Sequence, residues 1–67
     1  MPGATKITKI LRKLREKRGL SQEKLARLAD VSNNTIINIE RGENRNPTTA
    51  TLKKIAKALG IEPKNLM

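Results

Sequence analysis

The apolar residues of this 67-residue chain recur every three or four positions, and this spacing restricts the fold more than any other feature of the sequence. Ile7, Ile10, Leu11 and Leu14 form one such stripe, and the same spacing returns further along the chain. Side chains at this spacing share one face of an α-helix, whereas a half-buried strand would alternate apolar and polar residues. No segment alternates in that way. We therefore expect an all-α chain whose helices pack around one core.

Ser, Thr and Gly residues mark the ends of these helices. Ser21, Ser32 and Thr48 suit the N-cap position, where a hydroxyl accepts a hydrogen bond from a first-turn N–H group. Gly19 and Gly60 suit the left-handed conformation that follows a helix. The predicted helices cover about residues 5–18, 21–29, 32–41 and 48–59, with a last short turn at 63–66. Residues 1–67 thus form a single domain, in which we expect residues 1–4 to fray.

The second and fourth predicted helices each carry an apolar stripe that can join the core. In the second helix, Leu25, Leu28 and Ala29 share one face, and Ala26 lies on its flank. The fourth helix repeats the pattern with Leu52, Ile55, Ala56 and Leu59. Together with the first stripe, these side chains predict a compact domain of four to five helices.

The residue types that the chain lacks exclude most catalytic and metal sites. There is no His, Cys, Phe, Tyr or Trp. The chain therefore lacks an imidazole base, a thiolate nucleophile and the usual nitrogen and sulfur ligands of zinc. The six Asp and Glu residues are scattered, and no evident base activates a Ser or Thr. We expect no enzyme activity, no metal site and no cofactor.

The net charge of +9 indicates a polyanionic partner. Single-stranded nucleic acids are usually bound by stacking on aromatic rings, which this chain lacks, so duplex DNA or an acidic protein surface is favoured. Residues 19–47 hold as many acidic as basic residues, so the excess charge lies towards the two ends. No apolar run exceeds two residues, which argues against a membrane span or a secretory signal. We expect a cytoplasmic, nucleoid-associated protein.

The third predicted helix has an unusual polar face. At about 100° per residue, Ile36 and Ile39 lie on one side of it. The other side carries four side chains suited to contact bases, namely Asn33, Asn34, Ile37 and Asn38. An Asn amide matches N6 and N7 of adenine in the major groove, and an Ile can pack against the methyl group of thymine. A merely solvated face would more often carry Glu, Lys or Gln, so the pattern favours base recognition in duplex DNA.

Residues 11–61, LRKLREKRGLSQEKLARLADVSNNTIINIERGENRNPTTATLKKIAKALGI, resemble the phage-repressor/Cro-like (xenobiotic response element) family of helix-turn-helix domains. The resemblance rests on the linked motifs LSQEKLA, VS, IERG, NP and IAKALGI. It implies a lambda-repressor-like fold in which Asn33, Asn34 and Asn38 of the recognition helix contact bases. One departure is Asp30, at a turn where relatives usually carry Gly. Asp can adopt the left-handed conformation there at modest cost.

The resemblance also implies phosphate contacts and one internal ion pair. Gln22, at the start of the second helix, matches a residue that binds a DNA phosphate. The other residues expected to contact phosphates are Ser32, Thr35, Arg41, Asn44, Arg45 and Asn46. Capping alone would also explain Ser32, and electrostatic steering would explain the basic face of the first helix. Arg15 and Glu40 match an ion pair that ties the first helix to the third.

These features predict a sequence-specific regulator of transcription, most simply a repressor, that binds double-stranded DNA. We expect a homodimer on a palindromic operator with half-sites about 34 Å apart. Its dimer surface would lie on the fourth helix and residues 61–67. One alternative is a protein-interaction module of the same fold, an antitoxin or a coactivator-like bridge, with an acidic protein partner. A membrane-surface helix over residues 7–18 is disfavoured, because it lacks Trp or Phe anchors and the core needs its apolar stripe.

Overall fold

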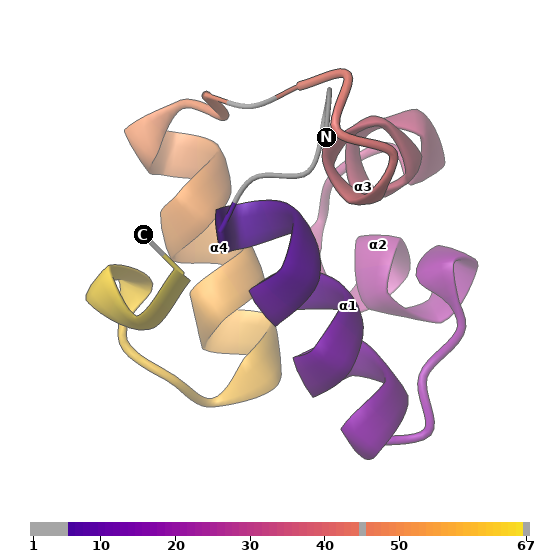
Figure 1. Ribbon diagram of the computed structural model, residues 1–67. Coiled ribbons are helices and arrows are strands. Elements are labelled where there is room, and N and C mark those ends of the chain that lie inside the picture. The colour runs from indigo at the N-terminus through magenta and orange to yellow at the C-terminus, as the bar shows by residue number, and fades with distance from the viewer. Residues whose placement is uncertain (1–5, 45, 67) are drawn as a thin grey trace.

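Four α-helices and a terminal 3-10 helix make up the described part of the chain, residues 6–44 and 46–66 of a computed structural model (Figure 1). They are α1 (Lys6–Lys17), α2 (Gln22–Ala29), α3 (Asn33–Glu40), α4 (Thr49–Leu59) and η1 (Pro63–Leu66). These described residues contain no strand, which confirms the predicted all-α class. The expected fraying of residues 1–4 lies outside the described residues.

The predicted caps are present at the helix ends. The hydroxyls of Ser21, Ser32 and Thr48 each accept a hydrogen bond from the backbone N–H three residues ahead, which satisfies a donor that has no partner within the helix. Gly60 ends α4 in the left-handed conformation, with a φ of 69°. The helix ends therefore follow from local chemistry, as the sequence indicates.

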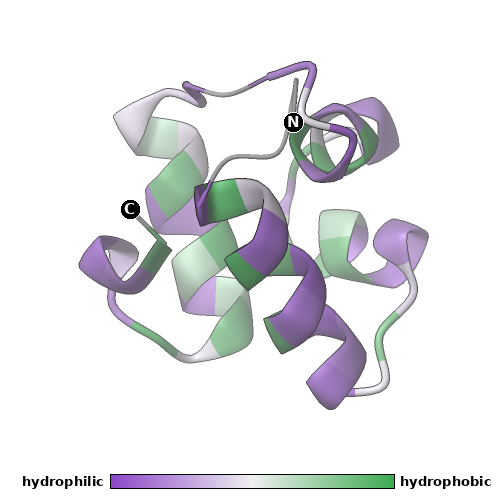
Figure 2. Ribbon diagram, in the orientation of Figure 1, coloured by the Kyte–Doolittle hydropathy of each residue, from purple (hydrophilic) through white to green (hydrophobic). Residues whose placement is uncertain are grey.

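One core joins all five elements. Apolar segments turn towards the middle of the bundle and hydrophilic segments cover its outside (Figure 2). The fully buried side chains are Leu11, Leu25, Ile36, Ile39, Ile55, Leu59 and Leu66. Residues 61–67 were expected, with the fourth helix, at a dimer surface. Within that segment Leu66 closes the core of the monomer, whereas the dimer surface as a whole stays a prediction; Met67 lies outside the described residues.

The buried face of α2 differs from the predicted one. Leu28 was expected in the core, but 55% of its surface is exposed. Ala26, placed on the flank by the sequence, is buried together with Leu25 and Ala29. The physical reason is that α2 packs against both α3 and α4. Its buried face is therefore centred between Leu25 and Ala26, about 100° away from Leu28.

A polar contact ties α1 to α3. The Thr8 hydroxyl donates a hydrogen bond of 2.9 Å to the backbone carbonyl of Ile39. This contact joins the first turn of α1 to the C-terminal end of α3 without adding charge to the interface. Within the described residues, none of the helices has the length and apolar character needed to cross a membrane.

Candidate nucleic-acid interface

The α2–α3 unit is shaped by a tight turn at Asp30. Asp30 adopts the left-handed conformation, with φ 57° and ψ 46°, as the sequence predicts for this position. Its N–H group and that of Val31 donate to carbonyls of the last turn of α2, the second bond to Ala26 measuring 3.0 Å. Ser32 then caps α3. With only three residues between the two helices, the turn holds α3 at a set angle to α2.

The outer face of α3 presents the predicted base-reading side chains. Asn33 and Asn34 are exposed, while Ile37 and Asn38 are half-buried. Ile36, on the opposite side, is fully buried. Figure 1 shows α3 at the edge of the molecule, with α2 beside it. The structure therefore brings these four side chains together on one face, backed by the core.

The hydroxyls at the start of α3 serve the helix cap. Ser32 Oγ accepts a hydrogen bond of 3.1 Å from the Thr35 N–H group and lies 2.7 Å from Thr35 Oγ1. One hydroxyl donates to the other, so one O–H group of the pair remains able to donate elsewhere. Capping is thus a present role of Ser32, whose hydroxyl is bonded to that of Thr35, and phosphate contact is an additional role that this geometry permits for both residues.

The segment after α3 is folded back on the end of the helix. The carbonyl of Asn38 accepts hydrogen bonds from the N–H groups of Glu43 and Asn44, at 2.9 and 3.0 Å. Asn44 Oδ1 in turn accepts one from the Asn46 N–H group. Arg41 forms an exposed ion pair of 2.9 Å with Glu43, which partly neutralises it. The predicted phosphate contact at Arg45 lies outside the described residues.

A buried carboxylate connects three elements. The Glu40 side chain is 0% exposed, and its oxygens accept hydrogen bonds of 2.6 and 3.0 Å from Nε and Nη2 of Arg15. Arg15 Nη1 also donates to the backbone carbonyl of Leu20 at 2.6 Å. The hydrogen bond with Glu40 raises the pKa of Arg15, against the opposing effect of desolvation. The ion pair implied by the resemblance is therefore present, and it joins α1 to α3.

Gln22 makes a contact that the sequence did not reveal. Its Nε2 donates a hydrogen bond of 3.1 Å to Oε1 of Glu40. Gln22 is half-buried and is the first residue of α2. The side chain expected to meet a phosphate is therefore held by the buried carboxylate. No local pattern signals this contact, because the two residues are far apart in the chain.

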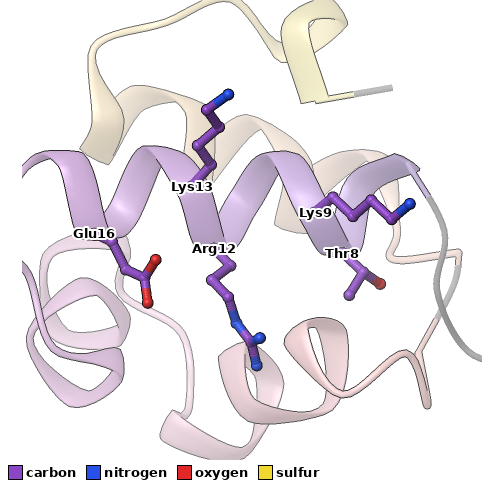
Figure 3. A pocket seen from close by; sticks show the side chains of 5 residues that line it. All are labelled: Thr8, Lys9, Arg12, Lys13 and Glu16. Carbon is purple, nitrogen blue, oxygen red and sulfur yellow. The ribbon is translucent and has the colours of Figure 1, made fainter.

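The basic residues of α1 point in different directions. A shallow hollow on the outer side of α1 is lined by five side chains, which Figure 3 labels Thr8, Lys9, Arg12, Lys13 and Glu16. Arg12 is directed towards the side of α1 that faces α3, and Lys13 is directed the opposite way (Figure 3). Within residues 6–44 and 46–66, no three His, Cys, Asp or Glu residues lie close enough to hold a metal ion.

Comparison with known proteins gives consistent matches. A family model described as helix-turn-helix matches residues 11–66. The control protein C.BamHI of Bacillus amyloliquefaciens is 47% identical over 51 residues, covering 76% of this chain and 62% of that protein. The HTH-type transcriptional repressor RghR of Bacillus subtilis (strain 168) is 46% identical over 57 residues, covering 85% and 42%. The chain thus spans less than two thirds of the length of each of these two curated relatives. The crystal structure of the restriction-modification controller protein C.AhdI from Aeromonas hydrophila matches with a TM-score of 0.85, at 42% identity and 92% coverage of each chain.

Proposed function

Because the chain belongs to the helix-turn-helix family, we propose that it is a sequence-specific regulator of transcription that binds double-stranded DNA and reads the major groove with α3. The observation that carries this proposal is the outer face of α3, where Asn33, Asn34 and Asn38 present amides beside Ile37. Amides pair with adenine edges, and the Ile side chain suits a thymine methyl group. The buried side chains of Ile36 and Ile39 anchor α3 to the core, so the outer amides keep a fixed position from which to contact base edges.

We further propose that the residues around this face contact the DNA backbone. Their positions at the start of α2, at the start of α3 and in the segment after α3 match those that flank a recognition helix in a groove. The proposed phosphate contacts are Gln22, Ser32, Thr35, Arg41, Asn44, Arg45 and Asn46. Contacts of this kind fix the register of the protein on the duplex, while the amides discriminate sequence.

The regulatory role is inferred from the similar proteins. One of them is named a transcriptional repressor, and two are named control or controller proteins, one of these in restriction-modification. We propose that this chain represses transcription as a homodimer on a palindromic operator in the cytoplasm. The similarity to C.AhdI extends over 92% of both chains and supports a controller role as the specific form of this regulation.

Selection of binding sites from a random duplex library tests the proposal. We expect an enriched motif with two-fold symmetry and half-sites about one helical turn apart. Asn34→Ala should lower the preference for that motif by at least about fivefold, the discrimination that one good amide–base pair supplies, and leave non-specific binding nearly unchanged. Ala also favours a helix, so the variant should fold.

Asn65→Ala is the matched control, because it removes the same amide from η1, on the other side of the molecule from α3 (Figure 1). Since residues 61–67 are expected at the dimer surface, its oligomeric state should be shown to equal that of the parent. Its Oδ1 accepts a hydrogen bond from the Glu62 N–H group, so its folding should be checked by circular dichroism. If the parent protein enriches no motif, the proposal of sequence-specific binding fails. Equal loss of affinity on all sequences would assign Asn34 to positioning instead of base reading.

A further inference from the structure

The carboxylate of Glu40 gathers more donors than the ion pair with Arg15 requires. Its Oε1 accepts from Gln22 Nε2 at 3.1 Å, and the Nε of Arg12 lies 3.8 Å from the same oxygen. Because both groups approach one oxygen, the guanidinium of Arg12 and the amide of Gln22 are close neighbours. They come from different helices, α1 and α2, and meet only in the folded chain.

Arg12 is free to bind elsewhere, whereas Arg15 is not. The Arg12 side chain is 57% exposed, and 3.8 Å is too long for a hydrogen bond. Arg15 is 12% exposed and already neutralises the carboxylate of Glu40. Because Arg15 neutralises Glu40, the positive charge of Arg12 is not balanced by that carboxylate. A guanidinium has five N–H donors in a fixed fork, which suits the oxygens of a phosphate.

Gln22 presents a matching donor. Its NH₂ group has two hydrogens, and the bond to Glu40 occupies one of them. The buried carboxylate restricts the rotation of this amide, so the second hydrogen has a defined direction. Ordering the amide before a ligand arrives removes part of the entropic cost of binding.

On these grounds we propose that Arg12 and Gln22 together form one clamp for a DNA phosphate, in which Glu40 orients the Gln22 amide by a hydrogen bond and attracts the nearby guanidinium of Arg12. This inference rests on the proposed function and adds a residue of α1 to the DNA-binding surface. It also divides the basic face of α1. Arg12 contacts a phosphate, whereas Lys13, which points the opposite way, contributes only long-range attraction (Figure 3).

Arg12→Gln and Lys13→Gln provide a matched test, since both remove one charge from an exposed position one residue apart on α1. Binding of each variant to duplex DNA should be measured across a range of salt concentrations. We expect Arg12→Gln to weaken binding about tenfold on specific and non-specific sequences alike, the size of one charge-assisted hydrogen bond. The log–log dependence on salt should become shallower by about 0.9 for each protomer bound. Lys13→Gln should weaken binding less than about threefold, because screening limits the effect of distant charges.

A double-variant cycle tests whether the two side chains share one phosphate. If they do, Arg12→Gln combined with Gln22→Ala should lose less affinity than the product of the two single losses. Losses that multiply would overturn the shared clamp, and so would equal effects of Arg12→Gln and Lys13→Gln. If the parent protein does not bind duplex DNA, the proposed function fails as well. If the parent protein binds duplex DNA but Arg12→Gln and Lys13→Gln weaken that binding equally, the clamp is refuted and the proposed function stands.

Discussion

Replacing Glu40 by Gln should lower the free energy of unfolding by about 3 kcal/mol, because it leaves the Arg15 guanidinium without a counter-charge in a nearly buried site. Gln keeps the length of the side chain and one acceptor oxygen, so the change removes mainly charge. In the parent, the carboxylate accepts two hydrogen bonds from Arg15 and one from Gln22. An exposed ion pair would cost less than about 1 kcal/mol.

The loss is large for a chain of 67 residues, whose total free energy of unfolding is expected to be about 3–10 kcal/mol. Urea unfolding followed by circular dichroism at the helix band measures it directly. With a denaturant dependence of about 1 kcal/mol per molar urea, the midpoint should fall by about 3 M. If the parent lies at the lower end of this stability range, the variant is partly unfolded without denaturant and gives a reduced helix signal.

The double variant Arg15→Met with Glu40→Met identifies the source of this loss. Removing both charges leaves no unpaired ion, so most of the lost stability should return. A loss below about 1 kcal/mol for Glu40→Gln would show that the pair acts as a surface pair, and the reasoning from burial would be wrong. If the double variant is as unstable as Glu40→Gln, the cost comes from lost hydrogen bonds at position 40, such as the one from Gln22, and not from the unpaired charge.

Three further expectations follow from burial, backbone geometry and titration. Leu25→Ala should cost about 2–5 kcal/mol in chemical denaturation, whereas Leu28→Ala should cost less than about 1 kcal/mol, because only Leu25 is buried; equal costs would contradict the packing of α2. Asp30→Gly should increase the free energy of unfolding by about 0.5–1 kcal/mol, since Gly adopts a φ of 57° without strain, and the increase should appear as a higher unfolding temperature. Because the pKa of Arg15 is raised, the charged side chain contributes its full stabilisation of the fold at any pH below the ordinary Arg pKa, and this contribution is lost only at a pH above that value. With no His or Cys in the chain, thermal unfolding should change little between about pH 6 and 9, and a clear transition there would refute this.

Much of the fold could be predicted from the sequence because its signals are local. The caps at Ser21, Ser32 and Thr48 each act within one helical turn, and the structure contains all three. The left-handed conformation of Asp30 is also a local property. The outer face of α3 was predicted from helical periodicity, since Ile36 could only belong to the opposite, buried side.

The errors and omissions concern contacts between helices. Periodicity identified a broad apolar side of α2 but not its centre, so Leu28 was placed in the core and Ala26 on its flank. The direction from which α3 and α4 approach decides that centre, and small Ala side chains permit the close approach. Leu66, which was counted within the expected dimer surface, is part of the core, and the rest of that surface stays a prediction.

The sequence by itself determined the helices, their ends and the amide-bearing face of α3, because hydrogen bonds within a turn and a period of 3.6 residues are short-range properties. The tertiary structure decided which side chains surround the Glu40 carboxylate. Arg12 and Arg15 come from α1, Gln22 from α2 and the carboxylate from α3. The resemblance implied the pair with Arg15, but Gln22 and Arg12 reach the same oxygen only because three helices pack around it. A long-range electrostatic centre of this kind leaves no periodic trace in the sequence.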